Sequence, residues 1–253
     1  MVNGYRNLSK WETHKPIASF FGQNDMSDPI PLYRYLDSDA ALKTIVARAF
    51  RVGKPSNFND PFEWRLGMAG INPDLAKQVI EGFLSEVNAS RQGILCFSDT
   101  VSDPVLWSIY AEKHRGVAFE IKRAWPADHL HQMTYTAERP VIDVNRLRGI
   151  GDHKALDEYL LPLLGRAMRQ KSRGWSFERE YRVFVDVNNL QHCKFSDGHY
   201  YWRIPDNLLS RVILGFRCPL EVSTIDNLLK MNGLMDTKIV RAEMCMETYA
   251  IKC

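Results

Sequence analysis

The pattern of apolar and polar positions along the chain predicts more strands than helices. Val117, Phe119 and Ile121 recur at every second position, as expected of a strand with one buried face. Compact apolar segments predict strands at Leu32–Leu36 and Gly93–Ser98 as well. Further strands are expected at 131–136, Glu178–Val187, Tyr200–Ile204 and Arg211–Phe216, with two more near the C-terminus.

Apolar residues at spacings of three and four predict the helices. Asn72 can cap a helix that runs to Asn88 and has a proline in its first turn. Asp103 and Pro104 give the same start signal to a second helix, which is expected to end at Gly116. Other helices are expected near 39–49, 152–170 and 221–231. Because strands outnumber helices and do not alternate with them regularly, we expect an α+β fold with a mixed, mostly antiparallel sheet.

The chain reads as one domain. Its 253 residues, of which 45% are hydrophobic, suffice for a core of their own, and no linker-like composition divides them. Residues 1–30 are polar with few periodic apolar positions, so we expect an N-terminal arm laid over a single domain of residues 31–253. No stretch approaches the roughly 18 apolar residues of a membrane span, and no signal peptide is evident, which favours a cytoplasmic protein without a membrane partner.

Charge and cysteine content narrow the function classes. A formal charge of +3 is mildly basic, less than a dedicated DNA-binding surface needs but compatible with an anionic ligand. The five cysteines are scattered without a CxxC pair, which argues against a disulfide framework and a zinc site. His129 and His131 lack partnering ligands, so no metal is expected. The sequence also lacks a Walker loop, a complete dinucleotide fingerprint and a GxSxG elbow.

The segment SFEREYRVFV (Ser176–Val185) places two carboxylates close together. In an extended chain Glu178, Glu180 and Arg182 face the same side. The two carboxylates repel each other unless a cation or ligand hydroxyls compensate, and Arg182 is the nearest cation. A carboxylate at a strand start can accept a ribose hydroxyl and stabilise an oxocarbenium-like centre. A charged strand face toward solvent is the alternative.

The segment LYRYL holds an arginine between two tyrosines. Strand alternation places Arg34 on the face opposite Tyr33 and Tyr35. A guanidinium fixed on a strand is a good clamp for a diphosphate, because its fork is rigid and always charged. An arginine paired with a surface carboxylate is the alternative.

The segment NFNDPFEWR (57–65) combines an Asn-Asp-Pro turn with a carboxylate between aromatic residues. One interpretation is a rim turn anchored by Phe58 and Phe62, from which Asn59 or Glu63 reaches a ligand. A buried turn whose Asp60 caps its own backbone is the alternative.

The strand that ends at Ser98 is followed by the aromatic helix predicted above. Trp107, Tyr110 and His114 are spaced by three and four residues, so they are expected on one face. Such a face can stack on a planar ring. Core packing of the aromatic residues, with His114 interacting with the helix dipole, is an equal alternative.

These segments together carry a resemblance to a known family. LYRY, FNDPFE, CFS, LW-xx-YA-xx-H-x-G and W-xx-E-x-E-YR occur in this order over residues 32–216. As a set they resemble a bacterial family known only as a domain of unknown function, number 2971. The name of that family supplies no activity.

A second resemblance does imply an activity. The order of an arginine, a strand serine and a Glu-x-Glu pair is similar to the Arg-Ser-Glu layout of ADP-ribosyltransferase toxins, which implies their split sheet with flanking helices. The matching positions are Arg34, Ser98 and Glu178 with Glu180. By this resemblance, the arginine holds the NAD phosphates, the serine orients the site, and the last glutamate stabilises the oxocarbenium state of the nicotinamide ribose. CFS stands where the toxins usually have Ser-Thr-Ser, so Tyr110 is an alternative middle group.

The resemblance implies an NAD-dependent mono-ADP-ribosyltransferase that acts as a bacterial toxin or phage-defence effector. NAD would be a substrate, no metal would be needed, and the acceptor would be a nucleic acid, RNA among them, or a protein. A neutralising antitoxin protein is an implied partner, and a non-catalytic module that senses a nucleotide or binds a protein is the alternative. The residues assigned are Glu180, Glu178 and Arg34 for catalysis; Arg34, Tyr33, Asn59, Ser98, Trp107, Tyr110 and His114 for NAD; and Lys171, Arg173 and Trp175, in the loop before the glutamates, for the acceptor.

Overall fold

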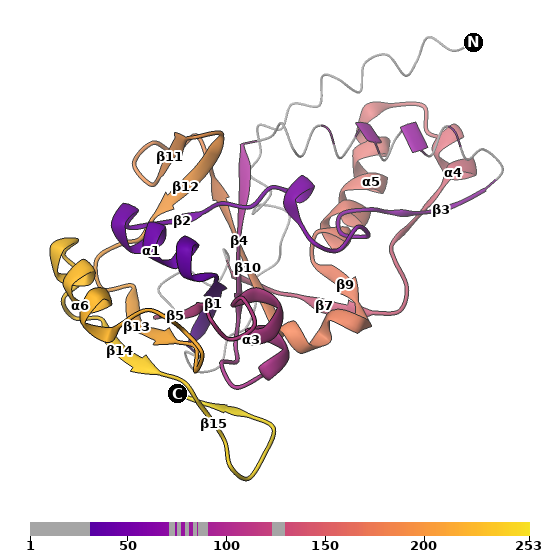
Figure 1. Cartoon of the computed structure of the whole chain (residues 1–253). Helices are drawn as coiled ribbons and strands as arrows, with labels where there is room; N and C mark the ends of the chain where they lie inside the picture. Colours follow the sequence, from indigo (N-terminus) through magenta and orange to yellow (C-terminus); the bar gives the residue numbers. More distant parts are fainter. Residues whose placement is uncertain are drawn as a thin grey trace.

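Seven strands form the central sheet, in the order β14-β13-β5-β1-β4-β10-β6 (Figure 1). The computed structural model describes residues 31–70, 91–122 and 130–253, with isolated positions between 74 and 85. Every neighbouring pair in this sheet is antiparallel except β13 and β14. The predicted α+β domain with a mixed, mostly antiparallel sheet is thereby confirmed. The strands are β1 (Leu32–Leu36), β4 (Gln92–Ser98), β5 (Val117–Ile121), β6 (Leu130–Gln132), β10 (Glu180–Asp186), β13 (Leu209–Leu214) and β14 (Lys238–Arg241).

The central sheet opens between β1 and β4. β1 pairs with β5 along its whole length, whereas it pairs with β4 only through Tyr33 and Ser98. β4 is in turn fully paired with β10, from Gln92 to Ser98. The two strands therefore separate beyond the Tyr33–Ser98 pair, and residues of both strands on that side line a pocket.

Apolar side chains cover both faces of the sheet. On one face, helices α1 (Ser38–Ala47) and α6 (Val222–Met231) belong to a core cluster that contains Phe50, Phe97 and Phe119. On the other face, helix α3 (Pro104–Tyr110) contributes to a cluster built around Tyr33 and Trp107. Arg34 pairs with Phe119 and extends over the first face, so the predicted separation of Arg34 from its two tyrosine neighbours is confirmed.

Four smaller sheets accompany the central sheet in the described part of the chain. Leu160 and Leu164 of helix α5 (His153–Ala167) pack with Leu66 and with Ile142 of β8 (Val141–Asp143) in a separate apolar cluster. Figure 1 shows α5 next to β9. The remaining elements are β2 (Ala49–Arg51), η3 (Pro55–Asn57), β3 (Gly67–Ala69), β7 (Thr134–Thr136), β8 (Val141–Asp143), α4 (Val144–Arg148), α5 (His153–Ala167), β9 (Gln170–Ser172), η5 (Arg173–Glu178), β11 (Cys193–Ser196), β12 (His199–Arg203), β15 (Glu243–Met244) and β16 (Ile251–Lys252).

Several predicted elements have different bounds in the structure. The strand predicted at 131–136 is divided into β6 and β7, and two other differences lie beside the pocket. Helix α3 ends at Tyr110 instead of Gly116, because three residues after it, His114 among them, adopt positive φ angles. Gly116 is needed because its backbone lies very close to β1. A Cβ at this position would lie 2.1 Å from the Leu36 carbonyl oxygen. The strand predicted from Glu178 begins at Glu180, after the 3₁₀ helix η5.

Two predicted segments lie wholly or mostly outside the described residues. The N-terminal arm of residues 1–30 is not among the described residues, and the predicted helix at 72–88 falls mostly outside them. None of the helices in the described ranges is both long and apolar enough to cross a membrane.

Candidate functional site

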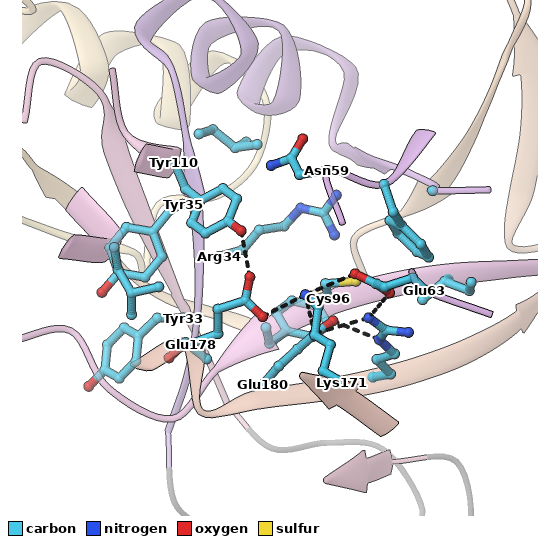
Figure 2. A pocket seen from close by; sticks show the side chains of 18 of the residues that line it. Tyr33, Arg34, Tyr35, Asn59, Glu63, Cys96, Tyr110, Lys171, Glu178 and Glu180 are labelled. Carbon is cyan, nitrogen blue, oxygen red and sulfur yellow. Dashed lines mark hydrogen bonds and ion pairs between the residues drawn. The ribbon is translucent and has the colours of Figure 1, made fainter. Parts of the chain in front are cut away.

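A pocket of about 260 Å³ occupies the opening between β1 and β4 (Figure 2). We call it the main pocket. Strands β1 and β4 form its walls, helix α3 contributes Tyr110, and the turn after η3 contributes Asn59. Its charged lining residues are Arg34, Glu63, Lys171, Glu178, Glu180 and Arg182.

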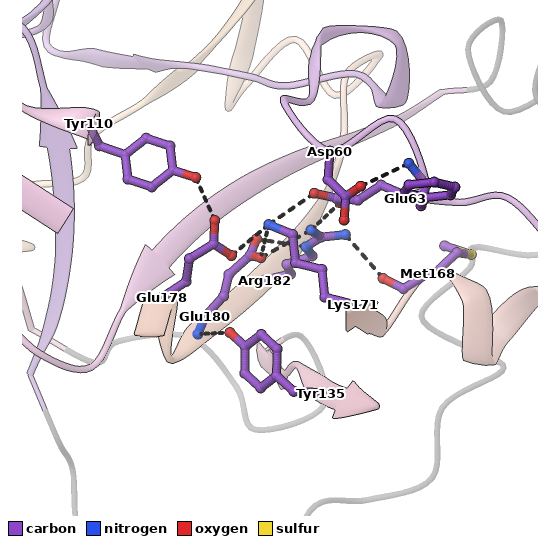
Figure 3. A network of polar contacts seen from close by, with 10 residues as sticks. Asp60, Glu63, Tyr110, Tyr135, Met168, Lys171, Glu178, Glu180 and Arg182 are labelled. Atoms are coloured by element: carbon purple, nitrogen blue, oxygen red, sulfur yellow. Dashed lines mark hydrogen bonds and ion pairs between the residues drawn. The ribbon is translucent and has the colours of Figure 1, made fainter. Parts of the chain in front are cut away.

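Lys171 lies at the centre of a buried ion-pair network (Figure 3). Its Nζ lies 2.9 Å from Glu63 Oε1, 2.6 Å from Glu178 Oε2 and 3.1 Å from Glu180 Oε2. The Trp175 ring also faces this ammonium group, with the ring centroid 5.2 Å from Nζ. All three carboxylates are buried, so each depends on this cation or on a second one for its charge to be tolerated.

Arg182 is the second cation of the network. Its Nε donates to Glu180 Oε1 at 2.7 Å, and its Nη2 pairs with Glu63 as well. Its Nη1 donates to the Met168 carbonyl oxygen at 3.3 Å, and Phe58 packs against the guanidinium at 5.0 Å. The network therefore holds three carboxylates against two cations, and Glu178 is the carboxylate that Arg182 does not contact in these pairs.

A left-handed residue explains how both glutamates face the pocket. Arg179 has a φ of 46°, and its side chain turns away to pair with Asp99 at 2.5 Å. This turn directs Glu178 into the same pocket as Glu180, the first residue of β10. Strand alternation predicts the two glutamates on one face. They do converge, but the turn at Arg179 brings them together, not an extended strand.

The two glutamates differ in proton affinity. Burial raises the pKa of Glu178 above its usual range, and the charge of Glu180 adds to this effect against the attraction of Lys171. Burial also opposes the ionisation of Glu180, but Arg182 and Lys171 outweigh it and lower its pKa to about 2. At neutral pH Glu180 is thus firmly ionised, and Glu178 is the member of the pair better suited to take up a proton.

Arg34 differs from the other cations of the pocket because it has no acidic partner among the described residues. Its Nη2 donates to the Arg51 carbonyl oxygen at 2.7 Å, and the guanidinium lies over the rings of Phe50 and Phe97 at 5.2 and 5.8 Å. Its Nη1 is buried without a hydrogen-bond partner in the described part of the chain. A guanidinium with a free donor beside a pocket is suited to bind an anion.

Ser98 lies on β4 where this strand pairs with both β1 and β10. Its backbone pairs with Tyr33 on one side and with Glu180 on the other, so it links the arginine strand to the glutamate strand. Its hydroxyl oxygen accepts a hydrogen bond from the Thr100 backbone N–H at 3.3 Å. Tyr33 also lines the pocket, and burial together with the charge of Glu120 raises its pKa to about 12.

Tyr110 connects helix α3 to the network. Its hydroxyl donates to Glu178 Oε1 at 2.5 Å, and burial raises the pKa of the phenol well above its usual value. Asn59, on the turn at the rim, opposes the effect of burial by lowering the pKa of the same phenol. Tyr110 and Asn59, both predicted to bind NAD, therefore line the same pocket.

The remaining predicted site residues lie elsewhere. Trp107 is fully buried, donates from Nε1 to the Val101 carbonyl oxygen at 2.7 Å, and does not line the pocket. His114 packs against Phe216 with ring centroids 4.9 Å apart, beyond the end of α3. The expectation that Trp107, Tyr110 and His114 share one helical face is therefore wrong for His114, which is outside the helix.

The predicted acceptor loop is divided between two environments. Arg173 is exposed on η5, and Trp175 covers the ammonium group of Lys171 from outside the pocket lining. Lys171 was predicted in an acceptor-binding loop, but it is buried on β9 and paired with three glutamates. Its central position had no local sequence signal, since its partners lie at sequence separations from seven to more than one hundred residues.

Three groups with different chemistry thus surround the main pocket. Glu180 is a buried anion, Glu178 is a carboxyl group with a raised pKa, and Arg34 is a cation with an unused hydrogen-bond donor. Within the described residues, no group of three or more His, Cys, Asp or Glu has the arrangement of a metal site. A comparison of the chain with protein-family models, curated proteins and solved structures found no match in any of the three. Functional inference for this protein therefore depends on the chemistry of the site.

Proposed function

We propose that the protein is an NAD-dependent mono-ADP-ribosyltransferase. The observation that carries the proposal is that Arg34, Ser98 and Glu180 line one pocket at the opening between β1 and β4. The same order of residues along the sequence resembles the Arg-Ser-Glu layout of ADP-ribosyltransferase toxins, and the opening of the sheet supports that resemblance.

In the proposed reaction the glycosidic bond between C1′ of the ribose and the nicotinamide nitrogen breaks, and its electron pair leaves with nicotinamide. A nitrogen or oxygen of the acceptor supplies the electron pair of the new bond to C1′. The ionised Glu180 stabilises the positive charge that develops on the ribose, because a fixed negative charge in a water-poor site interacts strongly with it. The proton of the acceptor goes to Glu178, whose raised pKa suits this role.

Arg34 binds the diphosphate of NAD in this scheme. Its unused Nη1 and the absence of an acidic partner among the described residues leave it free to pair with a phosphate oxygen. A volume of about 260 Å³ is at the small end of ligand pockets, so the main pocket would enclose the nicotinamide riboside end and leave the adenosine outside.

A biological role as a bacterial toxin or phage-defence effector follows from the same proposal. The acceptor is then a nucleic acid or a protein of the cell or phage, and an antitoxin protein is the expected neutralising partner. Toxicity on expression that disappears with Glu180→Gln supports this role.

One observation favours the second candidate, a non-catalytic nucleotide-binding module. Both oxygens of Glu180 are already paired with cations, Oε1 with Arg182 and Oε2 with Lys171. A carboxylate neutralised in this way gives less stabilisation to a cationic transition state than a free one. The pocket would then bind NAD or a related nucleotide through Arg34 without turnover.

Nicotinamide release from NAD separates the two candidates. We expect release by the wild-type protein, its loss in Glu180→Gln with NAD binding retained, and weaker NAD binding in Arg34→Ala. Glu243→Gln and Arg203→Ala, which change exposed residues on β15 and β12, are the matched controls. NAD binding by the wild-type protein without nicotinamide release, in the presence of RNA, DNA and cell lysate, supports the binding module instead.

A further inference from the structure

A second pocket of about 220 Å³ adjoins the main pocket, because both are lined by Lys171. We call it the side pocket. It is formed by the Asp-Pro-Phe turn, the segment after β7, and the end of α5 with β9. Its lining residues are Asp60, Phe62, Arg65, Thr136, Ala137, Glu138, Arg139, Pro140, Ala167, Gln170, Lys171 and Ser172.

Asp60 gives the side pocket an unsatisfied hydrogen-bond acceptor. The residue is only 4% exposed, and its Oδ1 accepts a hydrogen bond from the Phe62 backbone N–H at 2.9 Å. Its Oδ2 is buried and has no hydrogen-bond partner in the described residues; Figure 3 shows Asp60 beside Glu63. A buried acceptor without a partner costs free energy, so a ligand that brings an N–H or O–H donor would be stabilised there.

The entrance of the side pocket combines an aromatic ring with positive charge. Phe62 is 59% exposed, and the guanidinium of Arg139 lies 5.2 Å from its ring centroid. Arg65 and Arg139 are both exposed, and neither is ion-paired with a carboxylate of the described ranges. Arginine and an exposed ring together are the combination that binds single-stranded nucleic acid, through phosphate pairing and base stacking.

We propose that the side pocket binds one nucleotide unit of a single-stranded nucleic acid, as the acceptor subsite of the transferase. The base stacks on Phe62 and donates an N–H to Asp60 Oδ2, and the adjoining phosphate pairs with Arg65 and Arg139. Because Lys171 lines both pockets, a strand held there lies next to the glutamates of the main pocket. This inference rests on the proposed function for the role of acceptor, but the binding itself does not.

The charge of the rim favours a nucleic acid over a basic peptide. The two exposed guanidinium groups of Arg65 and Arg139 outnumber the one exposed carboxylate, that of Glu138, so the rim repels an incoming arginine or lysine side chain and attracts phosphate. The carboxylate of Asp60 is suited to the amino and imino N–H groups on a base edge. Binding of an arginine-containing peptide at this pocket is therefore an outcome that opposes the inference.

Fluorescence anisotropy with labelled single-stranded RNA and DNA oligonucleotides, without NAD, tests the binding. Phe62→Ala is expected to weaken binding roughly tenfold, as loss of one base–aromatic stack does. Phe195→Ala is the matched control, because Phe195 is exposed to a similar extent, at 63%, and lies on β11 outside the side pocket. A preference for RNA or for DNA identifies the source of the strand.

Two further variants test the polar contacts. Arg139→Ala is expected to reduce the slope of log K against log salt concentration by about 0.7, the value for one phosphate of a single strand. Arg203→Ala should leave that slope unchanged. Asp60→Asn replaces an acceptor oxygen by an amide donor, so it is expected to change the order of affinities among oligonucleotides of different base composition.

The results for the side pocket and for the enzyme are separable. Absence of oligonucleotide binding, equal loss in Phe62→Ala and Phe195→Ala, or stronger competition by an arginine-containing peptide overturns the inference. Nicotinamide release into water tests the main pocket without any acceptor. If the wild-type protein releases nicotinamide and Phe62→Ala binds oligonucleotides as the wild type does, the nucleic-acid site is refuted and the transferase is not. If Phe62→Ala weakens oligonucleotide binding but the wild-type protein releases no nicotinamide, the transferase is refuted and the nucleic-acid site is not.

Discussion

Lys171→Met is expected to cause a large, pH-dependent loss of stability. The ammonium group of Lys171 lies 2.6 to 3.1 Å from oxygens of Glu63, Glu178 and Glu180, and its side chain is 6% exposed. Methionine keeps the length of the side chain but leaves three buried carboxylates with Arg182 alone. Removing one partner of a buried ion pair costs about 3–5 kcal/mol, which for a chain of this size lowers Tm by roughly 10 °C.

The dependence on pH follows from the pKa values of the carboxylates. In the wild-type protein the pKa of Glu180 falls from 4.5 to about 2, so its pairing stabilises the fold above pH 4.5 and is lost as the pH falls toward 2. In the variant, Glu178 loses the cation that opposes the effect of burial, so its pKa rises further above that of the unfolded chain. The folded variant then takes up protons as the pH falls. Its loss of unfolding free energy relative to the wild type is therefore largest at high pH and becomes smaller on acidification.

Urea denaturation followed by tryptophan fluorescence, at pH 8 and pH 5, measures the effect. Buried Trp64 and Trp107 report unfolding of the pocket region and of the sheet. Lys230→Met is the control, because Lys230 pairs with Asp226 on the exposed face of α6 and should cost less than about 1 kcal/mol. The reasoning is refuted if Lys171→Met is as stable as the wild type at pH 8. It is also refuted if the variant loses the same free energy of unfolding at both pH values.

Two further variants examine single contacts of the site and fold. Tyr110→Phe removes the hydrogen bond to Glu178, so the free energy of unfolding should fall by about 2 kcal/mol. Because that bond lowers the pKa of Glu178, the acid limb of nicotinamide release should move to higher pH, and an unchanged pH profile argues against the role of Glu178. Gly116→Ala would place a Cβ 2.1 Å from the Leu36 carbonyl oxygen, so circular dichroism should detect failure to fold, whereas Gly151→Ala meets no atom within 4 Å and should fold normally.

The local elements of the fold were largely readable from the sequence. Strands Leu32–Leu36 and Val117–Ile121 have the bounds that their apolar positions predict. Asp103 caps α3 by accepting a hydrogen bond from the Val105 N–H, as its position before Pro104 indicates. These features depend on residues within one or two turns of each other, so short-range chemistry is sufficient to define them.

The sequence was less informative where an element ends or a chain turns. The end of α3 depends on three consecutive positive φ angles and on Gly116 against β1, and the spacing of Trp107, Tyr110 and His114 contains no sign of either. Likewise, the left-handed Arg179 places Glu178 in the pocket, although an extended strand would give the same sequence pattern. Such conformations are set by contacts with distant strands.

The sequence by itself determined the α+β class, the strand that carries Arg34 and the pair of glutamates before the Tyr-Arg of β10. Only the tertiary structure decided that β1 and β4 separate after one residue pair, and that Lys171 and Arg182 meet three glutamates in the resulting pocket. The physical reason is that burial of a charge is tolerated only when its partners converge in space. That convergence depends on the register of strands far apart in the chain, which no local pattern encodes.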